Sequence, residues 1–220
     1  MISLRQPIPQ DQAYHAFADT RVWLRTPNAA NVISSFLFVV LGLAGLFWLA
    51  RRSLPQRWMW MTFFGGVALV GCGSAYYHLN PCDATLFWDR LPMAMAFMSF
   101  FAAVIAERVN ERVARWLFVP LIACGIGSVL YWRNADDLRW YGVVQYDPML
   151  ALPILLLSGR SRYLRTSDLW IVVGSYVMAK LFEQMDVSLL NRLGVSGHTL
   201  KHVAAAAGCG WLLWALGRKR

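Results

Sequence analysis

Seven apolar segments follow one another along this chain, and each is close to the length of about 20 residues that a helix needs to cross a bilayer. They cover residues 32–50, 58–78, 86–106, 113–132, 140–158, 169–190 and 197–217. The connections between them are too short to hold a soluble domain. The sequence therefore predicts an all-α membrane protein, folded as a single bundle of seven transmembrane helices.

The composition agrees with a membrane location. Hydrophobic residues make up 58% and charged residues 15% of the 220 positions, which leaves too few charges to cover a soluble globule of this size. The first, second and fourth segments are the most apolar. The third begins near Asp89, the fifth carries Asp147, the sixth carries three charges, and the seventh is rich in alanine and glycine.

Both ends of the chain are polar. Residues 1–30 lack the continuous apolar stretch of a secretory signal and carry three prolines, so we expect a polar leader with at most a short surface helix. Residues 31–217 are expected to form one transmembrane domain, and residues 218–220 a short basic tail.

Basic residues predict the orientation of the bundle, because one side carries 12 of them and the other side six. The richer side holds Arg51, Arg52, Arg57, Arg108, Arg112, Arg115, Arg160, Arg162, Arg165, Arg218, Lys219 and Arg220. The poorer side holds Arg5, Arg21, Arg25, Arg133, Arg139 and Arg192. By the positive-inside rule the amino terminus lies outside and the carboxyl terminus in the cytoplasm. A nucleic-acid partner is not expected, because these cations are spread over several short loops.

Three of the four histidines stand where a metal site would need them. His78 ends the second segment, and His198 and His202 begin the seventh. Ser74 and His78 are four positions apart, as are the other two histidines, so each pair shares one face of a helix. Three neutral imidazoles leave the fourth tetrahedral position of a zinc ion to water, which is the arrangement of a catalytic site. The sequence predicts a hydrolase.

Most other ionisable residues of the segments fall in the same half of the bilayer as these histidines, which predicts a polar chamber in the outer leaflet. They are Asp89, Asp147, Lys180, Glu183 and Asp186. We expect Lys180 to neutralise Glu183, and Asp147 to hold a broken helix end before Pro148. For Asp89, a surface ion pair with Arg90 and a catalytic role stay equally open from the residues alone. His15, in the leader, is expected to be solvated.

Four cysteines give no disulfide framework. Cys72, Cys124 and Cys209 fall within apolar segments, where a small, soft packing residue is the default interpretation. Cys82 follows His78 closely enough to reach a metal, but Pro81 interrupts the helix that would carry it, so a thiolate ligand is not favoured.

The pattern of these polar residues resembles that of the alkaline ceramidases. The resemblance rests on SAYYH at 74–78, the aspartate of FWDRLPM at 89, and GHTLKH at 197–202, with PNAANVISS at 27–35 at the first segment. These enzymes belong to a superfamily of seven-span membrane hydrolases that includes the adiponectin and progestin receptor type proteins. The resemblance implies that His78, His198 and His202 hold zinc, that Ser74 steadies the substrate oxygen, and that Asp89 handles the proton of the zinc-bound water.

The same resemblance implies a function in lipid metabolism. Such an enzyme would cleave an N-acyl sphingolipid of the ceramide type into a free fatty acid and a long-chain amine, and would reach the acyl tails sideways from the lipid. The short tail and compact loops indicate a bacterial-type member in the inner membrane, with its site facing the periplasm. Because many bacteria make no ceramide, another N-acyl lipid stays open as the substrate.

Two departures from the family pattern concern ligands. Eukaryotic members resemble calcium binders through acids before the first span, whereas here only Asp19 matches and Arg21 and Asn28 occupy further ligand positions, so calcium is doubtful. Lys201 stands between the two histidines of the last segment, where eukaryotic members tend to carry an aromatic residue, which points to a different head group.

Two other classes of function remain as alternatives. A zinc-stabilised receptor or channel without turnover would need neither a base nor an oxyanion donor, so Asp89 together with Ser74 favours the enzyme. An intramembrane serine protease using Ser74 would leave two histidines unused, and the chain has no glycine-rich nucleophile loop before this serine.

Overall fold

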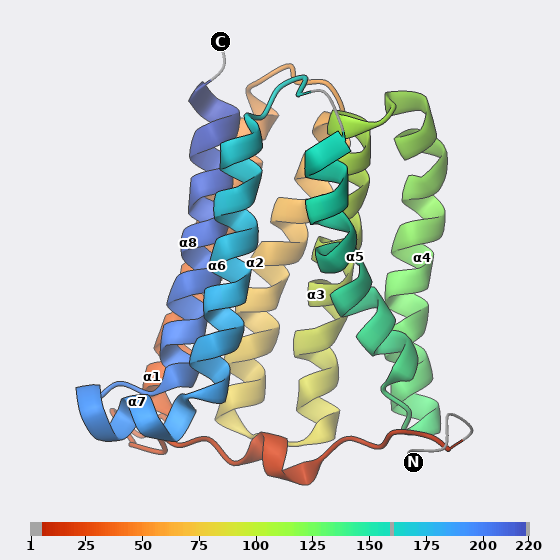
Figure 1. Cartoon of the computed structure of the whole chain (residues 1–220). Coiled ribbons are helices and arrows are strands. Elements are labelled where there is room, and N and C mark those ends of the chain that lie inside the picture. The colour runs from red at the N-terminus through yellow and green to blue at the C-terminus, as the bar shows by residue number, and fades with distance from the viewer. Residues whose placement is uncertain (1–5, 159–160, 219–220) are drawn as a thin grey trace.

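The fold is known from a computed structural model that describes residues 6–158 and 161–218. Within these residues the regular structure is helical, apart from one isolated bridge between Trp23 and Thr26. The elements are a 3-10 helix η1 (Gln12–His15), α1 (Ala29–Ala50), α2 (Arg57–Leu79), α3 (Asp83–Arg108), α4 (Glu111–Ala135), α5 (Arg139–Ser158), α6 (Thr166–Gln184), α7 (Asp186–Leu193) and α8 (Gly197–Arg218) (Figure 1). The all-α prediction is confirmed for the part of the chain that is described. Arg5, Arg160 and the tail residues Lys219 and Arg220 lie outside it.

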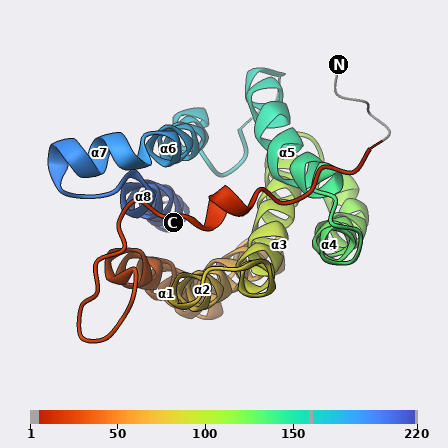
Figure 2. The same ribbon diagram turned by 90° about the horizontal axis from the view of Figure 1, so that it is seen from below.

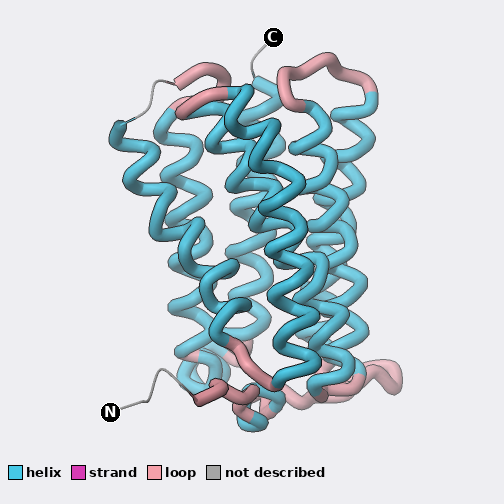
Figure 3. The backbone as a smooth tube through the Cα atoms, turned by 90° about the vertical axis from the view of Figure 1, so that its right-hand side faces the viewer, coloured by secondary structure: helices cyan, strands magenta, loops and turns pink. Residues whose placement is uncertain are grey.

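The long helices run up and down, and the short helix α7 lies across one end of the bundle (Figures 1 and 3). We name this end the site end; it also holds the leader and the α2–α3 turn, and the opposite end holds the last turn of α8. Helices α1 to α4 are long and apolar enough to cross a membrane. Helices α5, α6 and α8, with 20, 19 and 22 residues, have comparable lengths but are not among the described helices that meet this combined measure of length, hydropathy and charge.

The helices are arranged in a ring when the bundle is viewed from the site end (Figure 2). Helices α1, α2 and α3 pack side by side, α4 packs against α3, and α6 packs against α8. In contrast, α5 and α6 contact each other only sparsely. The leader crosses the site end beneath this ring, from α5 towards α1.

A glycine sets the close approach of α2 and α3 at the point where the candidate site lies. A Cβ atom on Gly73 would collide with the backbone carbonyl of Trp88, so only glycine fits there. Because the next residues along the two helices are Ser74 and Asp89, this approach brings both candidate catalytic residues to the same level. The expectation that glycines let helices approach closely therefore holds at this position.

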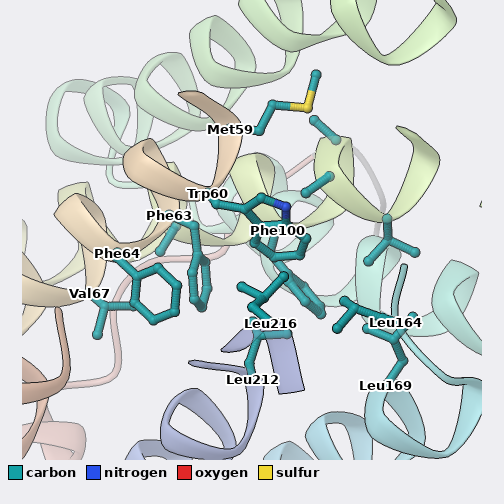
Figure 4. Packing of buried hydrophobic residues seen from close by; sticks show 14 of the residues in the cluster. Met59, Trp60, Phe63, Phe64, Val67, Phe100, Leu164, Leu169, Leu212 and Leu216 are labelled. Carbon is teal, nitrogen blue, oxygen red and sulfur yellow. The ribbon is translucent and has the colours of Figure 1, made fainter. Parts of the chain in front are cut away.

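Apolar packing fills much of the opposite half of the bundle (Figure 4). Aromatic rings of α2 and α3 meet leucines of α6 and α8 there. The labelled members include Trp60, Phe63, Phe100, Leu169, Leu212 and Leu216. Burial of a side chain of this size contributes about 1.5–3 kcal/mol. The bundle is thus held together away from its polar residues.

The sixth predicted segment, 169–190, is not one helix. Helix α6 ends at Gln184, and α7 starts at Asp186 and leaves the bundle axis. The Asp186 carboxylate accepts hydrogen bonds from the backbone N–H groups of Ala18 and His198, at 3.0 and 2.8 Å. These contacts join the turn to the leader and to the start of α8. Asp186 therefore connects segments at the site end and does not belong to the chamber within a span.

Candidate active site

The structure brings the three predicted ligand histidines together. His78 comes from the last turns of α2, and His198 and His202 come from the first turns of α8. The side chains are buried, and their candidate ligand nitrogens all lie within 4.8 Å of one another. The spacing of four residues places the two α8 rings on one face, opposite the ring from α2.

The unmet hydrogen-bonding capacity of these rings fits a metal ion. Neither nitrogen of His78 has a hydrogen-bond partner among the described residues, although the side chain is 1% exposed. A buried polar group without a partner is costly, and a metal ion would remove that cost. Imidazole nitrogens in a set of three suit zinc. The donor set present here therefore fits the predicted ion.

A serine of α1 orients one of the rings. Ser34 Oγ lies 2.8 Å from His202 Nδ1 and 3.0 Å from the Asn31 carbonyl. When the Ser34 hydroxyl donates to that carbonyl, it accepts from Nδ1–H and leaves the lone pair of His202 Nε2 free. Such an outer partner fixes the tautomer of a metal-binding histidine. Sequence reasoning missed Ser34, because only the packing of α1 on α8 identifies it.

The leader covers the histidines from the site end. The Phe17 ring lies edge to face on His78 and His198, with centroids 4.6 and 4.7 Å apart. His15 anchors this stretch through Tyr77 Oη at 2.8 Å and Asp83 at 3.1 Å. The expectation of a solvated His15 was wrong, because both ring nitrogens have protein partners. No sequence signal marks Phe17, whose neighbours are distant in the chain.

Ser74 and Asp89 are both buried and line one cavity together with His202. Ser74 Oγ is hydrogen-bonded to Ser35 Oγ at 3.0 Å. Asp89 Oδ1 has no hydrogen-bond partner among the described residues. The alternative of a surface ion pair between Asp89 and Arg90 is wrong, because both side chains are buried and they form no ion pair with each other.

Three further charged residues meet at the inner face of α6 and α8. Lys180 Nζ lies 2.8 Å from Glu183, which confirms the expected pair, and Lys201 Nζ contacts the other oxygen of Glu183 at 2.6 Å.

Asp147, which was expected near this cluster, lies elsewhere. It is exposed, and α5 continues past Pro148 to Ser158, so the predicted broken helix end was wrong. A proline removes one backbone donor and here does not end the helix.

A cavity of about 520 Å³ connects these polar groups to the apolar interior. Its volume is in the range of small-molecule sites, roughly 300–1,000 Å³. Helices α1, α2, α3, α5, α6 and α8 contribute to its wall, and leader residues such as Tyr14 contribute at the site end. The charged members lie at the site end, and Phe63, Phe100, Met149, Val172 and Leu212 are among the apolar members. The space suits a molecule with one polar end and one apolar tail.

The residues expected to matter for calcium have other partners. The Asp19 carboxylate is paired with Arg21 at 2.5 Å, and this hydrogen-bonded guanidinium holds the pKa of the carboxyl below its usual range. The Asn28 amide donates to the backbone carbonyl of His78 at 2.9 Å. Cys82, which was considered as a thiolate ligand of the metal near His78, contacts the Thr85 hydroxyl through its Sγ atom at 3.4 Å. These groups therefore take part in the local structure of the site end.

Apolar helices around a buried histidine cluster define an all-helical membrane protein with a candidate metal centre. A family model described as Ceramidase matches residues 26–216, which is most of the chain. The chain belongs to this ceramidase family, as the resemblance predicted. No curated protein matches the sequence significantly. Membership implies a hydrolase that acts on an amide bond and takes a lipid substrate.

Proposed function

We propose that this protein is a zinc-dependent intramembrane hydrolase that cleaves the amide bond of an N-acyl lipid. The products are a free fatty acid and a long-chain amine, as expected for a ceramide-like sphingolipid. The observation that carries the proposal is the common position of His202, Ser74 and Asp89 at the polar end of one largely apolar cavity.

The chemistry can be divided among the residues at this end. His78, His198 and His202 hold the zinc, which when bound polarises a carbonyl oxygen and lets water lose a proton near neutral pH. Asp89 accepts the proton of the attacking water and passes it to the departing amine. Its unpaired Oδ1 is available for this role. Ser74 donates its hydroxyl hydrogen to the substrate oxygen as negative charge develops there.

The apolar part of the cavity receives the acyl chain. Its wall of aromatic and aliphatic side chains offers no charge to a hydrocarbon tail. Helices α5 and α6 contact each other only sparsely. A lipid therefore enters this space from the bilayer between these two helices. Phe17 and the leader cover the histidines from the site end and exclude bulk water.

We propose a topology that agrees with the same arrangement. Helices α1 to α6 and α8 form seven spans of one transmembrane domain, residues 31–217, with the amino terminus outside and the carboxyl terminus in the cytoplasm. The arginine-rich loops support this, because Arg51, Arg108 and Arg162 lie near the end opposite the site. In a bacterial inner membrane the site then faces the periplasm. A reporter fused after Arg220 is expected to give a cytoplasmic signal, and an external signal would overturn this topology.

A lipid panel with and without chelator tests the function. Purified protein should release fatty acid from at least one N-acyl lipid, and removal of zinc should abolish this release. His202→Ala should lose bound zinc and activity together, because one of three ligands is gone. Zinc content near one per chain with no hydrolysis of any amide in the panel would contradict the proposal and favour a receptor-like protein.

A further inference from the structure

The polar end of the cavity holds an arginine whose guanidinium forms no ion pair with a described acidic residue. Arg90 lines the cavity and is 6% exposed, and no described residue forms a hydrogen bond or ion pair with its guanidinium. Burying such a cation without a counter-charge is costly, so it marks a functional position.

Aromatic rings hold this guanidinium in place. Its central carbon lies 4.3 Å from the Trp132 ring centroid, 4.8 Å from that of Tyr141 and 5.5 Å from that of Tyr14. Aromatic rings attract a cation but offer its N–H groups no strong lone-pair acceptor. The N–H groups therefore remain for an acceptor, and Nη1 is fully buried without one. A planar fork of this kind is suited to a carboxylate, sulfonate or phosphate group.

The neighbouring charges do not supply the missing anion. Asp89 precedes Arg90 on α3 and is close enough for a charge interaction, but consecutive residues of a helix do not face each other, and the two form no hydrogen bond or ion pair. Glu183 already accepts from Lys180 and Lys201, so one carboxylate serves two ammonium groups. Asp11, at the mouth, is exposed and accepts a hydrogen bond from the backbone of Ala13. This end of the cavity is therefore short of negative charge.

We propose that the amine part of the substrate carries an anionic group, and that Arg90 binds this group while the amide lies beside Ser74 and Asp89. The inference rests on the proposed function and narrows it to N-acyl lipids with an acidic head group. Because Asp89 and Arg90 are consecutive and both line the cavity, one molecule can reach both. A neutral hydroxylated head group would leave the arginine without a counter-charge.

Four lipids with the same dodecanoyl chain provide the test. N-dodecanoylglycine, N-dodecanoyltaurine and N-dodecanoyl-phosphoethanolamine carry a carboxylate, a sulfonate and a phosphate, and N-dodecanoylethanolamine is neutral. Dissociation constants are measured on chelator-treated protein, where no turnover occurs. At least one acidic lipid should bind about 10- to 100-fold more tightly than the neutral one, the size of a charge-assisted hydrogen bond. The preferred acid then identifies the anion.

Arg90→Gln should remove this preference, so that acidic and neutral lipids bind about equally. Arg133→Gln is the matched control, because its guanidinium also lies on an aromatic ring, 4.4 Å from the Phe87 centroid, but is exposed and does not line the cavity. This variant should keep the wild-type preference. If Arg90→Gln does not fold, the ratio of the dissociation constants for neutral and acidic lipids on the wild-type protein still tests the inference.

Wild-type protein that binds neutral and acidic lipids equally, or an Arg90→Gln variant that keeps the preference, would overturn the inference. The same lipids, offered to the zinc-loaded protein, separate this result from the proposed function. Hydrolysis without a charge preference would support the proposed hydrolase and contradict the acidic head group. A charge preference without hydrolysis would support the anion-binding site and contradict the proposed hydrolase.

Discussion

Helix α3 carries a buried carboxylate near each end, and the two are used in different ways. Glu107, at the opposite end, is 3% exposed and its Oε1 accepts hydrogen bonds from the backbone N–H groups of residues 162, 163 and 164, at 2.9, 2.6 and 2.7 Å. Asp89, at the site end, is 8% exposed, and its Oδ1 has no partner. The Glu107 carboxylate, with three hydrogen bonds to one oxygen, holds a loop in place. The Asp89 carboxylate has an oxygen without a partner, which is able to accept a proton.

The two ends of the bundle differ in the same way. At the opposite end, Asp168 accepts from the backbone N–H of Arg165 at the start of α6 and pairs with Arg218 at 2.8 Å. Even Arg108, whose Nε is unpaired, donates to Thr166 and to a backbone carbonyl through its other nitrogens. At the site end the unpaired atoms belong to Gln10, Asn31, His78, Asp89 and Arg90, and Asp89 and Arg90 line one cavity. Unpaired buried groups reduce stability, so their concentration at one end indicates function.

Asp89→Asn is the variant with the largest expected effect, and it tests the difference between the two carboxylates. An amide cannot accept the proton, so kcat should fall by about 10² to 10⁴. The three histidines are untouched, and zinc content should stay at the wild-type level. Steady-state kinetics and metal analysis on the same preparation measure both quantities. Full activity in this variant would remove Asp89 from the mechanism.

Ser74→Ala should have a smaller effect at the same end. Loss of one oxyanion donor lowers kcat by about 10² to 10³. KM should change little, because the bond strengthens as charge develops on the substrate oxygen. Ser35→Ala is the matched control, since it removes the hydroxyl that contacts Ser74 and leaves Ser74 itself in place. A Ser74→Ala rate equal to that of wild type would return this serine to a packing role.

The sequence predicts the histidine cluster, because a spacing along one helix and the order of the helices are enough to bring its members together. The spacing of four residues between His198 and His202 places both rings on one helix face, and an antiparallel bundle brings His78 to the same level. Ser74 and Asp89 are likewise predicted as members of the site, and the structure adds the contact of Gly73 with the Trp88 carbonyl that brings their helices together.

Contacts between distant residues account for what the sequence does not predict. The end of α6 depends on Asp186 accepting from Ala18, which lies 168 positions away. The environment of Arg90 needs rings from the leader, α4 and α5, none of which is near it in the chain. His15 gains partners only when the leader crosses the bundle. Such pairings leave no period or spacing in the sequence.

Glu107→Gln should have the smallest effect on the rate and a clear effect on stability. The amide is a weaker acceptor for the three backbone N–H groups, and hydrogen bonds to a charged group contribute about 1.5–3 kcal/mol. The melting temperature in detergent should therefore fall, while kcat at a temperature where both proteins are folded should equal the wild-type value. Glu111→Gln is the matched control, because its carboxylate is partly exposed and pairs with Arg162 at 3.3 Å, a contact type that contributes about 0–1 kcal/mol. A Glu107→Gln variant that is stable but inactive would show that the two ends of α3 do not divide structure from catalysis.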